Sequence, residues 1–186
     1  METLLGLAIG MGLSAACGFR VFVPLLGLSV ATLTGHLNVS SGFEWIGSWP
    51  ALVAFGTATI FEIGAYTIPV LDHLMDTLTT PAAVVAGTIM TASLVTDLSP
   101  FLKWTLALIA GGGVAGLVQT GSVLLRGAST AATGGFGNVL VSTGEIVGSI
   151  LTTLLALILP ILGLLVVVLL CGFIVARWIR AKHKPS

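Results

Sequence analysis

The chain has 186 residues, of which 56% are apolar and only 8% are charged, whereas an average soluble domain carries roughly 25% charged residues. Seven basic residues balance seven acidic ones, so the chain offers no basic surface for nucleic acid. With a mean hydropathy of +1.13, this composition excludes an ordinary soluble domain and predicts one integral membrane domain over residues 1–186, with the lipid bilayer as its solvent.

The first hydrophobic stretch, from about residue 4 to residue 35, is too long for one simple span. It is interrupted from Gly18 to Arg20, with Pro24 close behind, and Gly and Pro are the residues that most often break a helix. We therefore predict either a broken helix or a re-entrant piece followed by a span. A polar loop follows at residues 36–49.

Five further spans are predicted from apolar runs that Pro, Gly and polar residues separate. The polar stretch 72–80 is expected to leave the membrane or to lie at its interface. A second break or re-entrant segment is expected from Gly127 to Asn138, because this stretch is too rich in Gly and Thr for a stable helix. The last boundary, at Pro160, contains no polar residue, so two spans or one kinked helix are both open there. The five expected spans cover residues 50–71, 81–97, 101–125, 139–159 and 161–180.

The fold class predicted from this pattern is an all-α membrane protein with about six transmembrane helices. An even number of spans places both termini on one side of the membrane. Four of the seven basic residues lie in the last ten positions, and basic flanks favour the cytoplasmic side. We therefore expect residues 177–186 to form a basic cytoplasmic tail and both termini to be cytoplasmic.

Three ionisable residues fall inside predicted membrane segments, namely Arg20, Glu62 and Glu145. A charge at the bilayer centre costs about 2.5–3.5 kcal/mol on insertion scales, so these side chains should face one another or a wet cavity. They are candidates for an ion, proton or substrate pathway. A structural Arg–Glu bridge that locks the helices together, or a glutamic acid kept neutral by burial, would explain the same residues.

Asp72 and Asp76 are four residues apart and share one face if the segment is helical. Two such carboxylates could bind a divalent cation through oxygen, although helix capping or simple solvation at the membrane edge explains them equally well. A zinc site is not expected, because no second His or Cys lies nearby, and whether any metal binds is left open.

A second candidate site is the Gly-rich segment that joins two predicted spans. Exposed backbone N–H groups beside an arginine can hold an anion or a phosphate headgroup, while a close-packed loop accounts for the same composition. The residues of this candidate anion or headgroup loop are Arg126, Gly134, Gly135, Gly137 and Asn138.

No catalytic pattern is found in the chain. The sequence lacks a phosphate-binding P-loop, a Gly-x-Ser-x-Gly elbow and a His-Glu-x-x-His pair. We therefore predict no catalytic residues and no cofactor, and an enzyme is the least favoured class.

Several motifs occur in the order found in a known family. They are Gly18-Phe-Arg-Val-Phe-Val-Pro-Leu-Leu, Gly42-Phe-Glu-Trp-Ile-Gly-Ser, Phe61-Glu followed by Ile68-Pro-Val-Leu-Asp, and Phe136-Gly-Asn followed by Ser142 and Glu145. With these motifs the chain resembles the bacterial multi-pass membrane family called domain of unknown function 4126. The resemblance implies a helical membrane fold in a bacterial inner membrane and supplies no activity.

Two functions from different classes follow. The first is a small transporter or channel-like protein for an ion, a proton or a small anionic solute, with the buried carboxylates as its site. The alternative is a non-transporting scaffold that binds lipid or a partner, and in either case a homo-oligomer is plausible for so small a chain. A transporter should have a polar cavity lined by Arg20, Glu62 and Glu145, whereas a scaffold should have them paired in a dry core.

Overall fold

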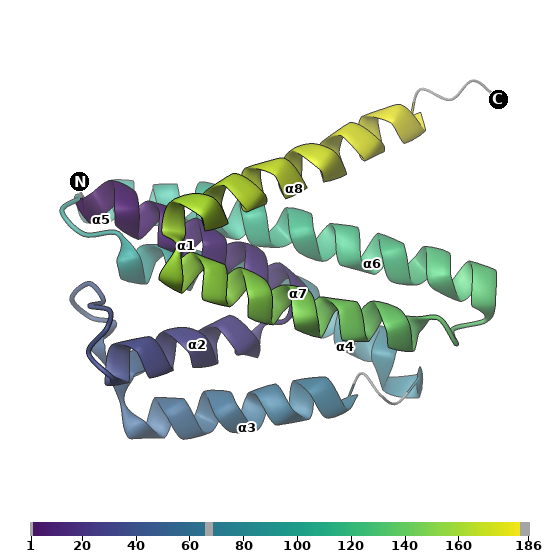
Figure 1. Ribbon diagram of the computed structural model, residues 1–186, viewed down its shortest axis with the longest axis horizontal. Helices are drawn as coiled ribbons and strands as arrows, with labels where there is room; N and C mark the ends of the chain where they lie inside the picture. Colours follow the sequence, from purple (N-terminus) through teal and green to yellow (C-terminus); the bar gives the residue numbers. More distant parts are fainter. Residues whose placement is uncertain (1, 66–68, 183–186) are drawn as a thin grey trace.

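The computed structural model describes residues 2–65 and 69–182, and within these ranges the chain is helical and contains no strand. The helices pack as a bundle whose long axis follows most of them (Figure 1). The predicted all-helical fold is therefore confirmed. In chain order the elements are α1 (Glu2–Phe19), α2 (Phe22–Leu33), η1 (Glu44–Gly47), α3 (Trp49–Ala65), α4 (Pro69–Leu94), α5 (Pro100–Leu106), η2 (Ala107–Gly112), α6 (Gly113–Thr133), α7 (Asn138–Ile158) and α8 (Pro160–Lys182).

Helices α1 and α2 form a hairpin whose break lies inside the bundle. The break falls at Arg20 and Val21, where the sequence predicted an interruption. Gly6, near the start of α1, lies against the backbone of Leu94 at the end of α4. The Ser40 N–H, in the segment after α2, donates to the carbonyl of the neighbouring Ser93. Both open ends of the hairpin therefore lie at the same end of the bundle, and its tip points into the interior (Figure 1).

Helix α1 is the central element, because it contacts α4, α6, α7 and α8. Its second half is buried on every side, which small residues allow. Ser14 is fully buried and its hydroxyl donates to the carbonyls of Gly10 and Gly87, each at 2.7 Å. A Cβ at Gly87 would lie only 2.6 Å from the Ala115 side chain. Close backbone approach through glycine and a hydroxyl bonded to carbonyls are how membrane helices pack without long apolar side chains.

Helix α4 is continuous from Pro69 to Leu94, with Pro81 in its interior. The helix that contains the predicted span therefore begins before Pro81, and the polar stretch 72–80 belongs to its first part. A proline inside a helix removes one backbone hydrogen bond. The Thr80 hydroxyl, beside the proline, donates to the carbonyl of Asp76 one turn earlier in the helix at 2.7 Å.

Helix α6 likewise extends further than predicted. It runs through Gly127 to Thr133, so the break expected from Gly127 is wrong, and the chain turns only at residues 134–137. A glycine in a helix costs only about 1 kcal/mol relative to alanine, too little by itself to end the helix. The turn uses left-handed glycines, with φ of 64° at Gly134 and 97° at Gly135. The Thr133 hydroxyl accepts the N–H of Gly137 at 2.8 Å.

The last two elements are separate helices, which decides between the two readings of residues 139–180. Helix α7 ends at Ile158 and α8 begins at Pro160, whose missing N–H suits a first helical turn. A Cβ at Gly163 would lie 3.2 Å from the backbone of Ala156, so the two helices meet closely beside the turn. Further along, α8 diverges from the bundle (Figure 1). The expected basic tail begins within α8, and residues 183–186 lie outside the described part of the chain.

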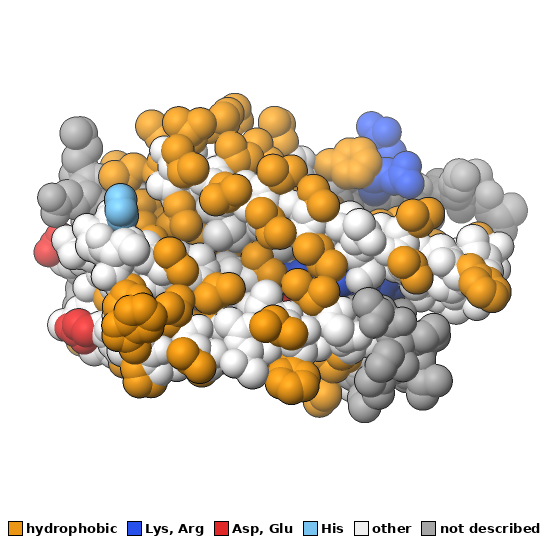
Figure 2. All heavy atoms as spheres, turned by 60° about the horizontal axis from the view of Figure 1, so that its bottom comes forward, with side chains coloured by type: hydrophobic (Ala, Val, Ile, Leu, Met, Phe, Trp, Pro, Cys, Tyr) orange, Lys and Arg blue, Asp and Glu red, His pale blue; other side chains and the backbone are white. Residues whose placement is uncertain are grey.

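Within the described residues, four helices are long and apolar enough to cross a membrane, while α1, α2 and α3 are shorter apolar helices. The expected count of six spans is therefore not confirmed. The surface has the distribution that a bilayer requires. Hydrophobic side chains cover much of the middle of the face seen in Figure 2, acidic side chains lie at one end, and Lys and Arg side chains gather at the other. The four long segments are Met75–Leu94, Pro100–Thr133, Asn138–Ile158 and Pro160–Arg177.

Candidate functional site

Helix α7 turns a polar face inward and an apolar face outward. Its buried positions recur every three or four residues, as one face of a helix requires, and none of them is a large apolar residue. In lipid this inverted arrangement is favourable, because apolar side chains lose nothing by facing acyl chains while polar groups need partners inside the protein. The buried residues of α7 are Ser142, Glu145, Ser149, Thr152, Thr153 and Ala156.

Glu145 lies at the centre of a buried charged cluster and contacts two arginines. Its Oε2 lies 3.3 Å from Nη2 of Arg20, at the tip of the α1–α2 hairpin. Arg126 on α6 donates to both carboxylate oxygens, from Nε to Oε1 at 3.1 Å and from Nη2 to Oε2. The same Arg20 nitrogen donates to the hydroxyl and the carbonyl of Ser142, one turn before Glu145, at 2.5 and 3.2 Å. One carboxylate thus joins the hairpin tip to α6 and α7.

Arg126 extends this cluster to α4. Its Nη1 lies 2.7 Å from Oδ1 of Asp76, so the guanidinium bridges two carboxylates on two different helices. The Arg126 side chain is 4% exposed and that of Asp76 is 18% exposed. The charged side chains therefore form a chain from Arg20 through Glu145 and Arg126 to Asp76, and Asp76 is its most accessible member.

Glu62 performs a different task. Its carboxylate accepts the backbone N–H groups of Val21, at 2.7 Å, and Phe22, at 3.1 Å. These are the first N–H groups of α2, a helix whose N-cap residue makes no side-chain hydrogen bond of its own. A helix N-terminus carries orphan donors and a partial positive charge, so Glu62 of α3 caps α2 from a neighbouring helix. This carboxylate holds the hairpin tip in place.

The three charged residues of the predicted membrane segments are buried within the bundle, as we expected from the cost of exposing a charge to lipid. Arg20 is 1% exposed, Glu62 2% and Glu145 4%, so none faces hydrocarbon. Arg20 and Glu145 contact each other directly, while Glu62 joins them through the backbone beside Arg20. Pairing and hydrogen bonds lower the cost of burying these charges.

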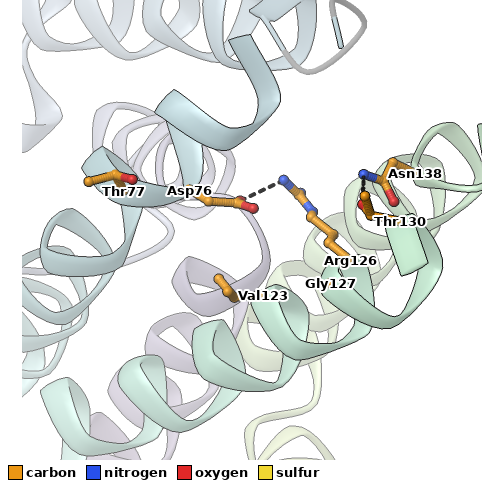
Figure 3. Close-up of a pocket in the computed structure, with 7 residues that line it drawn as sticks. All are labelled: Asp76, Thr77, Val123, Arg126, Gly127, Thr130 and Asn138. Atoms are coloured by element: carbon orange, nitrogen blue, oxygen red, sulfur yellow. Dashed lines mark hydrogen bonds and ion pairs between the residues drawn. The ribbon is translucent and has the colours of Figure 1, made fainter. Parts of the chain in front are cut away.

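One end of the cluster opens into a cavity of about 250 Å³. Asp76 points toward the Arg126 guanidinium from α4, while Thr130 and Asn138 lie beside Arg126 (Figure 3). The Asn138 amide donates to the Thr130 hydroxyl at 3.0 Å, which fixes both side chains at the cavity wall. The full lining is Asp76, Thr77, Val123, Arg126, Gly127, Thr130 and Asn138.

The other candidate residues are distributed as follows. Asp72 belongs to α4, one turn before Asp76, but its side chain lies outside the described residues. Gly134, Gly135 and Gly137 form the turn after α6 and do not line the cavity. Among the described residues, no group of three His, Cys, Asp or Glu side chains could hold a metal ion.

Arg126 is the central residue whose position sequence reasoning misjudged, because it was assigned to a loop. A signal for its true place exists in the helical period. Polar and small residues recur at Ala115, Gln119, Ser122 and Arg126, and all four are buried on α6. Such spacing predicts one inward face of a helix. Extending the period of α6 past residue 125 would have placed Arg126 beside the carboxylates.

An apolar surface around a core that also holds paired charges and hydroxyls defines a helical protein of the membrane class. Within that class, the model of the family described as domain of unknown function (DUF4126) matches residues 7–180. The chain belongs to this family, as its motifs indicated. No curated protein and no solved structure matches the chain.

Proposed function

We propose that this protein is a small membrane transporter or channel-like protein for an ion, a proton or a small solute. The observation that carries the proposal is the continuous chain of charged side chains from Arg20 through Glu145 and Arg126 to Asp76. It leads from the tip of an interrupted helix to an open cavity. Buried ionisable residues and broken helices are the features from which transporters build their sites.

We further propose a membrane topology for the bundle. Helix α1 has 18 residues and α2 has 12, lengths of about 27 and 18 Å, so the hairpin enters from the side of loop 34–48 and returns to it as a re-entrant element. Five segments then cross the membrane one after another: α3, α4, the continuous segment from α5 to α6, α7 and α8. This places the start of α1 and the end of α8 on opposite sides, unlike the sequence-based expectation, which counted residues 4–35 as including one span.

The basic end of α8 supports a cytoplasmic C-terminus, because Lys and Arg flanks stay on that side. The cavity at Asp76 and the turn at residues 134–137 then face the cytoplasm, and the loop at residues 34–48 faces outward. The membrane that we propose is a bacterial inner membrane.

A specific observation favours the scaffold as the alternative. Arg20 and Glu145 are paired and buried, Glu62 caps α2, and none of the three lines the cavity. This is the arrangement that we expected of a scaffold, not of a transporter. In a scaffold, this pairing would only lock the hairpin against α7, and the apolar outer faces would bind lipid or a second copy of the chain.

Reconstitution separates the two functions. Purified protein in liposomes is tested for proton flux with an enclosed pH dye and for ion and solute flux with tracers. Glu145→Gln removes the central charge, and Glu62→Gln perturbs the hairpin cap while keeping one acceptor oxygen. Glu44→Gln is the matched control, since Glu44 is an exposed carboxylate at the start of η1.

For a transporter, we expect flux with the wild type and the Glu44 variant and a loss of at least tenfold with the Glu145 variant. Absence of flux across the whole panel, with the protein folded in the liposomes, would leave the scaffold as the function.

A further inference from the structure

The cavity beside Asp76 presents opposite charges to whatever enters it. Asp76 supplies a carboxylate that is 18% exposed, and Arg126 supplies the guanidinium paired with it. Thr130 and Asn138 add a hydroxyl and an amide at the wall. The lining therefore offers acceptors for a cationic group and donors for an anionic group within one small volume.

The charges that line this cavity cancel. Asp76 contributes one negative charge and Arg126 one positive charge. A ligand with a net charge would leave an uncompensated charge in a partly dry site, which is costly. A ligand carrying both charges would leave the balance unchanged.

We propose that this cavity binds a small zwitterion, with its ammonium group at Asp76 and its acidic group at the Arg126, Thr130 and Asn138 side. Such a ligand exchanges the internal Asp76–Arg126 pair for two pairs with itself, so each protein charge keeps a partner. The volume of about 250 Å³ suits a molecule of amino-acid size. A lipid headgroup of the ethanolamine type carries the same two charges.

Because Asp76 is on α4 and Arg126 is on α6, exchange of this pair also changes how the two helices are held together. While the ligand occupies the cavity, Arg126 keeps its two bonds to Glu145, and the contact between α4 and α6 at this level runs through the ligand. The inference rests on the proposed transport function, since it names the ligand class at the open end of the charged chain.

The test measures binding by thermal unfolding of the purified protein in detergent, because a ligand that binds only the folded state raises Tm with concentration. The probes are glycine, methylammonium and acetate at equal concentration and ionic strength. Glycine carries both charges, and the other two carry one each. Glycerophosphoethanolamine, a headgroup without acyl chains, is the fourth probe, and its affinity relative to glycine distinguishes a lipid source from a free amino acid.

Two variants and one control accompany the probes. Asp76→Asn removes the ammonium partner while Arg126 stays bound to Glu145. Gly127→Leu fills the cavity without removing any charge, because a Cβ at Gly127 meets nothing within 4 Å and leucine is a better helix former than glycine. Asp97→Asn is the matched control, since Asp97 lies before α5 and its φ of 60° is one that asparagine also adopts.

We expect a zwitterion to raise Tm, and methylammonium and acetate to have little effect. Both cavity variants should weaken zwitterion binding at least tenfold, while the Asp97 variant should bind as the wild type does. Equal binding of a singly charged probe, or unchanged zwitterion binding in both cavity variants, would overturn the inference. Zwitterion binding without tracer flux in liposomes would support the cavity and refute transport. Flux of another ion that neither cavity variant alters would support transport and refute the cavity.

Discussion

Replacing Glu62 tests whether one carboxylate holds the tip of the α1–α2 hairpin. Glu62→Leu keeps a similar volume and removes both acceptor oxygens, so the buried N–H of Val21 and the part-buried N–H of Phe22 lose their partner. An unsatisfied buried donor costs about 1–3 kcal/mol. The expected loss of unfolding free energy is therefore about 2–6 kcal/mol for two donors. Glu62→Gln keeps one acceptor oxygen and should lose about half as much.

Glu44, the first residue of η1, provides a control with the same kind of bond. Its carboxylate accepts the backbone N–H of Gly42 at 2.8 Å, but it is exposed, so water replaces it when it is removed. Glu44→Leu should change stability by less than about 0.5 kcal/mol, as is usual for surface substitutions. The comparison isolates burial, because the acceptor and the donor type are the same at both sites.

The assay is unfolding in mixed detergent micelles, followed by tryptophan fluorescence and circular dichroism. Amide hydrogen exchange supplies the local measurement, since the Val21 and Phe22 amides should exchange faster in Glu62→Leu while amides in the middle of α7 remain protected. If Glu62→Leu and Glu44→Leu lose the same small amount of stability, and if the two amides stay protected, then Glu62 does not cap α2 and the reasoning fails.

Two further predictions concern packing and topology. Gly87→Ala should lower the free energy of unfolding by about 1–3 kcal/mol through overpacking, because its Cβ would lie 2.6 Å from the Ala115 side chain. Gly113→Ala is the control, and it should be neutral or slightly stabilising because its Cβ meets nothing within 4 Å. Equal unfolding midpoints for the two variants would contradict the close helix contact. In intact cells, an impermeant maleimide should label Ser41→Cys and spare Phe136→Cys, whose side chain is 90% exposed in the structure, and the reverse pattern would invert the proposed orientation.

The membrane class and the inward orientation of the intramembrane charges could be predicted from the sequence because both follow from solvation. An apolar chain with few charges needs a bilayer, and Arg20 and Glu145 need partners away from lipid. The interruption at Arg20 was visible for the same reason. These predictions depend on the chemistry of single residues and not on how the helices are arranged.

The errors arose where packing decides the outcome. Pro81 and Gly127 are local signals for helix ends, yet both lie inside long helices. Neighbouring helices compensate for the weak local propensity, which a reading of one segment cannot detect. The hairpin over residues 4–35 was ambiguous because a turning helix and a crossing helix have the same hydropathy. Arg126 was missed as the central cation as a direct result of ending its helix too early.

The position of α1 has a consequence for how the chain is made. This helix emerges from the ribosome before α4, α6 and α7, which bury it, and 122 residues separate Arg20 from the Ser142 group that it contacts. Until α7 has been synthesised, the first arginine must remain near water or an insertion factor. A nascent chain stopped before residue 138 should therefore leave the hairpin accessible to protease, and its insertion would be completed only when the seventh helix arrives.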